Sequence, residues 1–314
     1  MASVAVELAG QQGLCTMSPK NNPADEAEDL REAEAAFNEA RRYLFGIAYR
    51  MLGCVSESED ILQEAWIRWQ TYDRSKVENA RAFLTTTVTR LAINVLESAR
   101  VRRQAYVGPW LPEPVDTSSD PALGALNAEA LEVAVMMLLE KLTPTERAAY
   151  VLREAFDYPY EQIAEIIGQT QANARQLVSR ARKHLVAGKR ASVAAADHQR
   201  FLTVFVAAAQ EGNVAVLEKL FTEDVVSYAD GGGVVRASKF PVVGRQRVAK
   251  YYHAFADRFW PGVTVEPVEA NGRPAVSLSR DGTVFAVLTV SVTPDGIDRV
   301  LVMMNPSKIA AMAV

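Results

Sequence analysis

Three prolines within seven residues interrupt the otherwise helical first half of this 314-residue chain. The run Gly108-Pro109-Trp110-Leu111-Pro112-Glu113-Pro114 cannot lie inside a helix, because each proline fixes its φ angle and lacks an amide hydrogen. On either side of this run, apolar residues recur every three or four positions, which is the period of a helix. The sequence therefore predicts two all-α domains, at residues 37–106 and 126–188, joined by a linker at 107–125.

The pattern changes near His198, where a third domain begins that we place at residues 198–314. Two helical stretches come first, at His198–Glu211 and Val214–Phe221. Short runs of β-branched residues follow, at Val263–Val268, Ala275–Ser279, Val284–Ser291 and Ile297–Met304. Two-residue hairpin signals separate the runs, at Asn271-Gly272, Asp281-Gly282 and Asp295-Gly296. Helices followed by a meander predict an α+β domain whose helices cover one face of the sheet.

Composition excludes several kinds of protein. The net charge of -4 shows no global basic excess, so an argument for nucleic acid must come from local charge. Cys15 and Cys54 lack metal-ligand spacing and the three histidines are scattered, so we expect no metal site and no cofactor. No basic leader and no run of about 20 apolar residues is present, which predicts a cytoplasmic protein without a membrane partner. Residues 1–36 have no core-forming pattern and are interpreted as a flexible tail.

The segment from Leu142 to Leu185 has the pattern of a helix-turn-helix. Thr143-Pro144-Thr145-Glu146 forms a capping box, Gly168 allows a tight turn, and Thr170 can cap the next helix. From Thr170 to Arg190 there are six Lys or Arg and no acid, which is typical of a helix that lies in a major groove. The candidate DNA-binding residues are Gln171, Asn173, Arg175, Gln176, Ser179, Arg180, Arg182 and Lys183. The alternative is an ordinary helical hairpin with a solvated basic face.

Two helices of the first domain carry further candidate sites. The helix over residues 56–70 is amphipathic and exposes polar residues, among them Asp60, Gln63 and Glu64. The helix over residues 81–103 has five arginines against one acid, which suits a nucleic-acid backbone or an unpaired strand. Its candidate DNA-binding residues are Arg81, Arg90, Asn94, Arg100 and Arg103. For both helices, a solvated polar face is the alternative.

These residues resemble the extracytoplasmic-function sigma factors over about residues 37–186. Glu59-Asp60-Ile61-Leu62-Gln63-Glu64-Ala65-Trp66 is similar to the family's region 2, and Asn94 followed by Glu97, Arg100 and Arg103 resembles the end of that region. Leu142-Thr143-Pro144-Thr145-Glu146-Arg147 resembles region 4. The order of the two domains and their linker fit the same family.

The rest of the chain resembles a subgroup in which a SnoaL-like (NTF2-like) α+β cone domain is fused to the sigma factor. Three motifs are typical of it: Trp110-Leu111-Pro112-Glu113-Pro114, Asp230-Gly231-Gly232-Gly233 and Asn305-Pro306-Ser307-Lys308-Ile309. The second motif usually continues with lysine, where this chain has Val234, and the third usually has aspartate in place of Ser307. The resemblance implies that these residues make regulatory contacts, with Trp110–Pro114, Asp230–Gly233, Asn305, Pro306 and Lys308 as the candidates.

The resemblance also implies a mechanism and its partners, RNA polymerase core and promoter DNA. Asp60, Gln63 and Glu64 would bind the clamp coiled coil of the β′ subunit, and region 4 would contact the β flap. The helix at 81–103 would read the −10 element with a base extruded from the opened strand, and the helix at 171–184 would read the −35 element. The C-terminal domain would modulate transcription in cis, and the protein would not be an enzyme.

Two other classes stay open from the residues alone. One is a helix-turn-helix regulator that senses a ligand through its third domain and never joins polymerase. The other is an enzyme that carries a DNA-binding head, with Asp230, Tyr251, His253 and Asp257 as candidate pocket groups. His253 has a structural alternative as a surface or core histidine. Asp230–Gly233 is not followed by a helix with a Lys-Ser/Thr pair, so a turn or contact loop is favoured over a phosphate loop.

Overall fold

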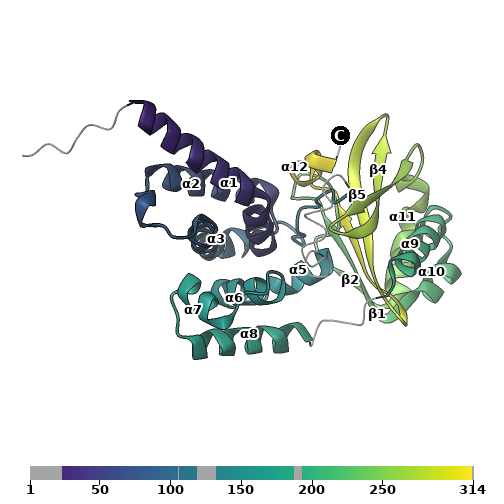
Figure 1. Ribbon diagram of the computed structural model, residues 1–314. Helices are drawn as coiled ribbons and strands as arrows, with labels where there is room; N and C mark the ends of the chain where they lie inside the picture. The colour runs from purple at the N-terminus through teal and green to yellow at the C-terminus, as the bar shows by residue number, and fades with distance from the viewer. Residues whose placement is uncertain (1–22, 105, 119–131, 187–192, 313–314) are drawn as a thin grey trace, which may run out of the picture.

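The computed structural model describes residues 23–104, 106–118, 132–186 and 193–312. A helical half and a half built on one sheet lie side by side, and the linker and helix α5 run between them (Figure 1). The helices of the first half are α1 (Pro23–Leu52), α2 (Val55–Thr71), α3 (Ala80–Gln104), α5 (Val133–Leu139), α6 (Pro144–Glu154), α7 (Tyr160–Ile167) and α8 (Gln171–Val186), with a 3-10 turn at Arg74–Lys76.

Helix α1 begins earlier than the sequence analysis expected. Residues 23–36 were assigned to a flexible tail, but they form the first turns of α1, while residues 1–22 lie outside the described residues. Ala33 is 2% exposed, and its carbonyl accepts a hydrogen bond of 2.9 Å from the Trp69 indole. Ala33 and Phe37 lie four residues apart on one helical face, so two buried apolar positions are enough to pack this extension against α2.

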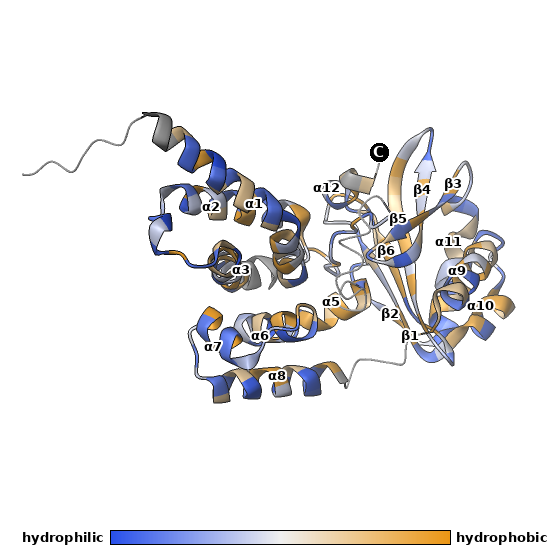
Figure 2. Ribbon diagram, in the orientation of Figure 1, coloured by the Kyte–Doolittle hydropathy of each residue, from blue (hydrophilic) through white to orange (hydrophobic). Residues whose placement is uncertain are grey.

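The two helical domains share one hydrophobic core. Buried residues of α1, α2 and α3 are continuous with those of α6, α7 and α8, for example Leu44 and Leu84 with Val151 and Val178. Figure 2 shows α5 as hydrophobic almost throughout, whereas hydrophilic residues mark much of α8. The linker therefore joins two helical domains that are packed against each other, not held apart.

The C-terminal domain contains one six-stranded sheet with the order β2-β1-β6-β5-β4-β3. Its strands are β1 (Phe221–Asp230), β2 (Val242–Val243), β3 (Thr264–Ala270), β4 (Arg273–Arg280), β5 (Thr283–Thr293) and β6 (Gly296–Met303). Its helices are α9 (Ala195–Gln210), α10 (Val214–Leu220), α11 (Arg245–Phe259) and α12 (Pro306–Ile309), with a final 3-10 turn at Ala310–Met312. β1 and β6 are parallel, and every other described pairing is antiparallel.

Both faces of the sheet are covered, where the sequence analysis expected helices on one face. Leu288 and Val302 face α9, α10 and α11, whereas Val287 and Leu301, their neighbours along the strands, face Leu111 of the linker, α5 and α12. Successive side chains of a strand point to opposite faces, so β5 and β6 need apolar residues at almost every position. The sheet is thus the platform on which the linker and α5 rest.

The hairpin predictions are confirmed at two of three turns. Asn271-Gly272 and Asp281-Gly282 have positive φ angles of 56° and 72°, and of 50° and 74°, as a type I′ turn requires. The third turn is shifted by one residue, because Gly296 already pairs with Thr293 in the ladder. A Cβ atom on Gly296 would lie 2.5 Å from the Leu220 carbonyl oxygen, so this glycine serves close backbone approach and not the turn.

Strand β1 and helix α11 were not predicted from the sequence. β1 carries Glu223 and Asp224 near its start, which are poor strand formers, and it forms because it lies between β6 and β2 in the sheet. Among the described helices, none combines the length and hydropathy of a membrane-spanning segment.

Candidate nucleic-acid interface and interdomain joints

The helix-turn-helix forms at the predicted positions. Thr143 Oγ1 accepts a hydrogen bond of 3.3 Å from the Glu146 amide, and the Glu146 carboxylate accepts one of 3.1 Å from the Thr143 amide. This reciprocal capping box starts α6. Gly168 ends α7 with a φ of 67°. Thr170 Oγ1 accepts a hydrogen bond of 3.2 Å from the Asn173 amide at the start of α8.

Helix α8 buries its apolar face and exposes its basic one. Its buried residues are Ala174, Leu177, Val178, Ala181 and Leu185. Of the predicted DNA-binding residues on this helix, Asn173 is half-buried and the other seven are exposed. The exposed residues are Gln171, Arg175, Gln176, Ser179, Arg180, Arg182 and Lys183. Two of them form ion pairs within the chain, since Arg182 pairs with Glu154 at 2.7 Å and Arg180 lies 4.0 Å from Glu146. Both arginines are themselves exposed, so a phosphate can compete for them.

Helix α3 places its predicted DNA-binding residues in different surroundings. Asn94 is exposed, and the Arg81 guanidinium lies 3.8 Å from the centre of the Tyr43 ring. Arg90 does not point freely to solvent: it donates hydrogen bonds of 2.8 Å to the Ile166 carbonyl and 3.0 Å to the Glu165 carbonyl. Arg100 and Arg103 belong to α3, but their side chains lie outside the described residues.

An open hollow of about 610 Å³ lies beside Arg90, between the end of α2 and α3. Tyr72 and Phe83 line it with ring centres 4.5 Å apart, and Thr86 and Thr87 add hydroxyl groups. An aromatic wall beside hydroxyls and a guanidinium is chemically suited to an unstacked base.

The predicted polymerase-binding residues share the outer face of α2. Asp60 and Gln63 are exposed, and Glu64 is half-buried with a 2.8 Å ion pair to Arg68. The opposite face, with Ile61, Leu62, Ala65 and Trp69, is buried in the helical core. The polar face of α2 is therefore available to a partner.

The three subgroup motifs meet at one buried cluster, which we call the Asp230 joint: Tyr106, Trp110, Leu111, Asp230, Asn305 and Lys308. Asp230 is 0% exposed, and its Oδ2 accepts hydrogen bonds of 2.8 Å from Lys308 Nζ and 2.9 Å from the Leu111 amide. Its Oδ1 accepts a bond of 2.6 Å from the Tyr106 hydroxyl. A buried ion pair is tolerated when hydrogen bonds satisfy its remaining atoms, as happens here.

Lys308 connects the end of the chain to the linker. Its ammonium donates a hydrogen bond of 2.6 Å to the Leu111 carbonyl and lies 4.4 Å from the centre of the Trp110 ring. Asn305 Nδ2 donates a bond of 3.0 Å to the Tyr106 hydroxyl. Burial, and then the hydrogen bond to Asp230, raise the pKa of Tyr106, so this hydroxyl stays a donor.

The glycines of the second motif are required by close packing. Gly232 has a φ of 62°, and a Cβ atom there would lie 2.4 Å from Asn305 Nδ2. Of the two departures from the subgroup pattern, Val234 is 78% exposed and lies outside the joint. Ser307 is exposed, but its hydroxyl donates a hydrogen bond of 2.9 Å to Asn305 Oδ1 at the edge of the joint.

A second cluster, the Asn271 joint, ties the sheet to both helical domains: Tyr49, Glu113, Val115, Met136 and Asn271. Asn271 is 0% exposed, and its Nδ2 donates a hydrogen bond of 2.7 Å to the Tyr49 hydroxyl of α1. The same Nδ2 lies 3.8 Å from the Met136 sulfur of α5. Tyr49 in turn donates a hydrogen bond to the Glu113 carbonyl in the linker.

The linker is bonded to Asn271 and to the start of α2. The Val115 amide donates to Asn271 Oδ1 at 3.1 Å, and the Asn271 amide donates to the Val115 carbonyl at 2.9 Å. The Glu113 carboxylate accepts a bond of 2.7 Å from the Val55 amide and so caps α2. Burial raises the pKa of Glu113. In the sequence, Asn271 carries only the signal of a turn residue, and nothing marks Tyr49 as a contact.

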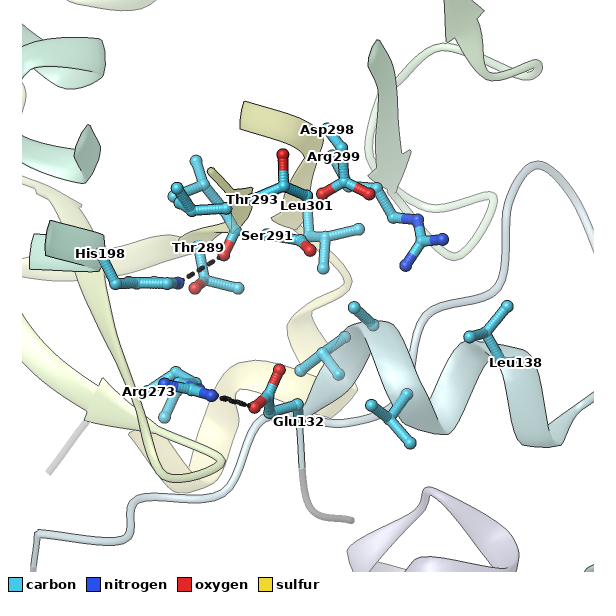
Figure 3. A pocket seen from close by; sticks show the side chains of 16 residues that line it. Glu132, Leu138, His198, Arg273, Thr289, Ser291, Thr293, Asp298, Arg299 and Leu301 are labelled. Carbon is cyan, nitrogen blue, oxygen red and sulfur yellow. Dashed lines mark hydrogen bonds and ion pairs between the residues drawn. The ribbon is translucent and has the colours of Figure 1, made fainter. Parts of the chain in front are cut away.

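A third contact joins α5 to the sheet (Figure 3). Arg273 forms an ion pair with Glu132 at the start of α5, beside a cavity of about 50 Å³.

His198 lines the same cavity. Its Nε2 lies 2.7 Å from the Val290 carbonyl, and burial lowers the pKa of this histidine. His198 is therefore neutral and donates through Nε2.

The candidate catalytic residues are not brought together. Asp230 is held in the Asp230 joint, whereas His253 and Asp257 are exposed on α11. His253 Nδ1 is hydrogen-bonded to the Gly212 carbonyl at 2.8 Å, and Tyr251 lines a separate cavity.

Comparisons with known proteins agree with this geometry. The family model "Sigma-70 region 2" matches residues 36–104, and "Sigma-70, region 4" matches residues 132–185. The chain is 37% identical over 232 residues to the ECF RNA polymerase sigma factor SigJ of Mycobacterium tuberculosis, which covers 72% of this chain and 74% of SigJ. The chain belongs to the extracytoplasmic-function sigma factors.

A second relative and a solved structure of SigJ also cover the C-terminal domain of this sigma factor. The probable ECF RNA polymerase sigma factor SigI of M. tuberculosis is 31% identical over 280 residues, 87% of this chain and 93% of SigI. The crystal structure of M. tuberculosis SigJ superposes with a TM-score of 0.72 at 30% identity, covering 88% of this chain and 98% of that one. The six-stranded sheet with its helices is consistent with an NTF2-like domain in this position.

Proposed function

We propose that this sigma factor binds polymerase core through α2, reads the −10 element with α3 and the −35 element with α8, and is restrained in cis by its C-terminal domain. In the resting protein the sheet holds the two helical domains together through the linker. Binding to polymerase and promoter separates them and frees α3 for DNA.

The observation that carries the proposal is the position of Asn271. One buried amide contacts Tyr49 of the first helical domain and Met136 of the second, and it also bonds to the linker between them. A residue that contacts both domains in the packed arrangement stabilises that arrangement relative to an open one. The Asp230 joint acts in the same direction, because it fixes the linker at Leu111.

The packed arrangement also occupies DNA-binding groups. Arg90 is bonded to the end of α7, and the Tyr158 hydroxyl of the second domain lies 3.3 Å from the hydroxyl of Thr85 in α3. A strand of DNA that binds α3 competes with these contacts. The hollow lined by Tyr72, Phe83, Thr86 and Thr87 is the site we propose for an extruded base.

Run-off transcription with polymerase core tests the proposal. The informative variant is Asn271→Gly, because glycine keeps the positive φ of the turn and removes only the side chain. Loss of the buried bonds weakens the packed arrangement by about 1–2 kcal/mol, so transcription at limiting sigma factor rises by up to roughly 5–30-fold.

The matched control is Asp281→Gly, at the corresponding position of the exposed hairpin between β4 and β5. It should transcribe like the original protein. Unchanged or reduced transcription by a folded Asn271→Gly variant would count against restraint by the C-terminal domain, and no transcription from any promoter would count against the sigma role.

A further inference from the structure

A cavity of about 480 Å³ lies inside the C-terminal domain, between α11 and the sheet face that α9, α10 and α11 cover. It is distinct from the Asp230 joint, the Asn271 joint and the small cavity beside His198. Its volume falls in the range of about 300–1,000 Å³ that is usual for small-molecule sites. Helix α11 and its C-cap supply all the aromatic residues of its wall, which are Tyr251, Tyr252, Phe255, Phe259 and Trp260.

The polar groups of this cavity are neutral in its buried part and cationic at its exposed end. Ser227 and Tyr252 are buried and hydrogen-bonded to each other at 2.8 Å. Burial raises the pKa of Tyr252, so this pair is uncharged. Arg236 and Arg258 also line the cavity but are exposed, so they lie at its open end. Neither of them forms an ion pair with any residue that the structure describes.

The charge of the lining selects the ligand chemistry. Among the described residues that line the cavity there is no Asp, Glu or His, so general acid–base chemistry has no obvious group and an anion meets no repulsion. Two guanidinium groups at the mouth match a carboxylate, which they bind through charge-assisted hydrogen bonds. The aromatic wall behind them matches an apolar body.

We propose that this cavity binds an apolar carboxylic acid, with the carboxylate held by Arg236 and Arg258 and the body packed against the aromatic wall of α11. The inference does not depend on the transcriptional role proposed above.

Residues that line the cavity directly precede residues of the Asp230 joint along the chain. Ala229 lines the cavity directly before Asp230, and Met304 lines it directly before Asn305. The Met304 amide donates a hydrogen bond of 2.8 Å to the Asp230 carbonyl. A ligand that moves these residues therefore moves the carboxylate and the amide that hold the linker.

The loop after the glycine motif connects the same two places. Arg236, Ala237 and Ser238 line the cavity, while the Ser238 carbonyl lies 3.8 Å from the position of a Cβ atom on Gly108 in the linker. Occupancy of the cavity is thereby transmitted to residues 106–115.

Calorimetric titration of the full chain with 2-naphthoate and with decanoate tests the site, with 2-naphthamide as the neutral counterpart of the first. Saturable binding of one acid per chain is expected, and 2-naphthamide should bind more weakly. Arg236→Gln and Arg258→Gln should each weaken acid binding by about tenfold, the effect of losing one charge-assisted hydrogen bond. Arg247→Gln, on the exposed part of α11 outside the cavity, is the matched control and should bind like the original protein.

Thermal unfolding of the variants verifies that the exposed substitutions leave the fold intact. The proposal is overturned if neither acid binds saturably, or if Arg236→Gln and Arg258→Gln bind as tightly as Arg247→Gln. Amide exchange of residues 106–115 should change by about twofold or more when 2-naphthoate saturates the chain. Unchanged exchange at saturation overturns the transmission to the linker.

Discussion

The guanidinium of Arg90 in α3 donates a hydrogen bond of 2.8 Å to the carbonyl of Ile166 at the end of α7. A cation at this end donates to carbonyls of the last turn of α7 and lies at the negative end of the helix dipole. The same arginine stands in the helix that we propose to read the −10 element. One side chain thus belongs to two alternative interfaces, one within the protein and one with DNA.

Replacing Arg90 by alanine should loosen the packing of α3 on α7. Loss of hydrogen bonds from a charged donor, discounted for partial exposure, weakens the interface by about 1 kcal/mol. Amide exchange in α6 and α7 should accelerate by about fivefold. The control is Arg41→Ala, which removes an exposed ion pair with Glu59 inside the first helical domain and should leave α6 and α7 unchanged. Equal exchange in the two variants would refute the capping role of Arg90.

Replacing Lys308 by methionine should destabilise the C-terminal domain. The substitution keeps most of the side-chain volume but leaves the Asp230 carboxylate buried without its cation, at a cost of roughly 3–5 kcal/mol. Denaturant unfolding measures this loss, and Lys250→Met on the exposed side of α11 is the matched control. Adding Asp230→Asn to Lys308→Met should restore part of the stability, because the uncompensated charge is then absent. A double variant no more stable than Lys308→Met would contradict the ion-pair explanation.

The sequence predicts the helix-turn-helix well because its determinants are local. Thr143 with Glu146, Gly168 and Thr170 each act on backbone groups within a few residues, so spacing alone locates α6, α7 and α8. The hairpins at Asn271 and Asp281 are predictable for the same reason. The start of α1 is not, because a helix of small residues is decided by whether Ala33 finds a neighbour to pack on.

The joints are predictable in part. The subgroup motifs identify most residues of the Asp230 joint, but no spacing rule tells that Asp230 accepts its bonds from Tyr106, Leu111 and Lys308. Asn271 and Tyr49 are 222 residues apart and meet only through the tertiary fold. The turn signal Asn-Gly explains the backbone at Asn271 but gives no information about the hydrogen bonds of its side chain to Tyr49 and Val115.

The stability of the chain should depend on pH through His198. Burial lowers the pKa of His198 below its ordinary value of 6.5, so the imidazole binds a proton more readily in the unfolded chain than in the folded one. Stability is therefore full above pH 6.5 and falls as the pH drops from there towards the lowered folded pKa. The variant His198→Asn should lose this component of the pH profile, whereas His184→Asn, on the exposed face of α8, should keep it. Identical profiles of unfolding free energy for the two variants would argue against His198 as the source.

The exposed face of α8 should divide into residues that specify sequence and residues that only hold the backbone. Arg175 lies in the N-terminal half of α8, where a recognition helix reaches base edges, and Lys183 lies near its end. Arg175→Ala should relax discrimination among upstream-element variants by about 1–3 kcal/mol at one base position. Lys183→Ala should instead weaken transcription from every variant similarly and reduce the salt dependence of binding by about one ion. Run-off transcription across a set of single-base upstream variants, at two salt concentrations, separates the two effects. If Arg175→Ala transcribed all the upstream-element variants in the same ratios as the original protein, α8 would not read the element through this residue.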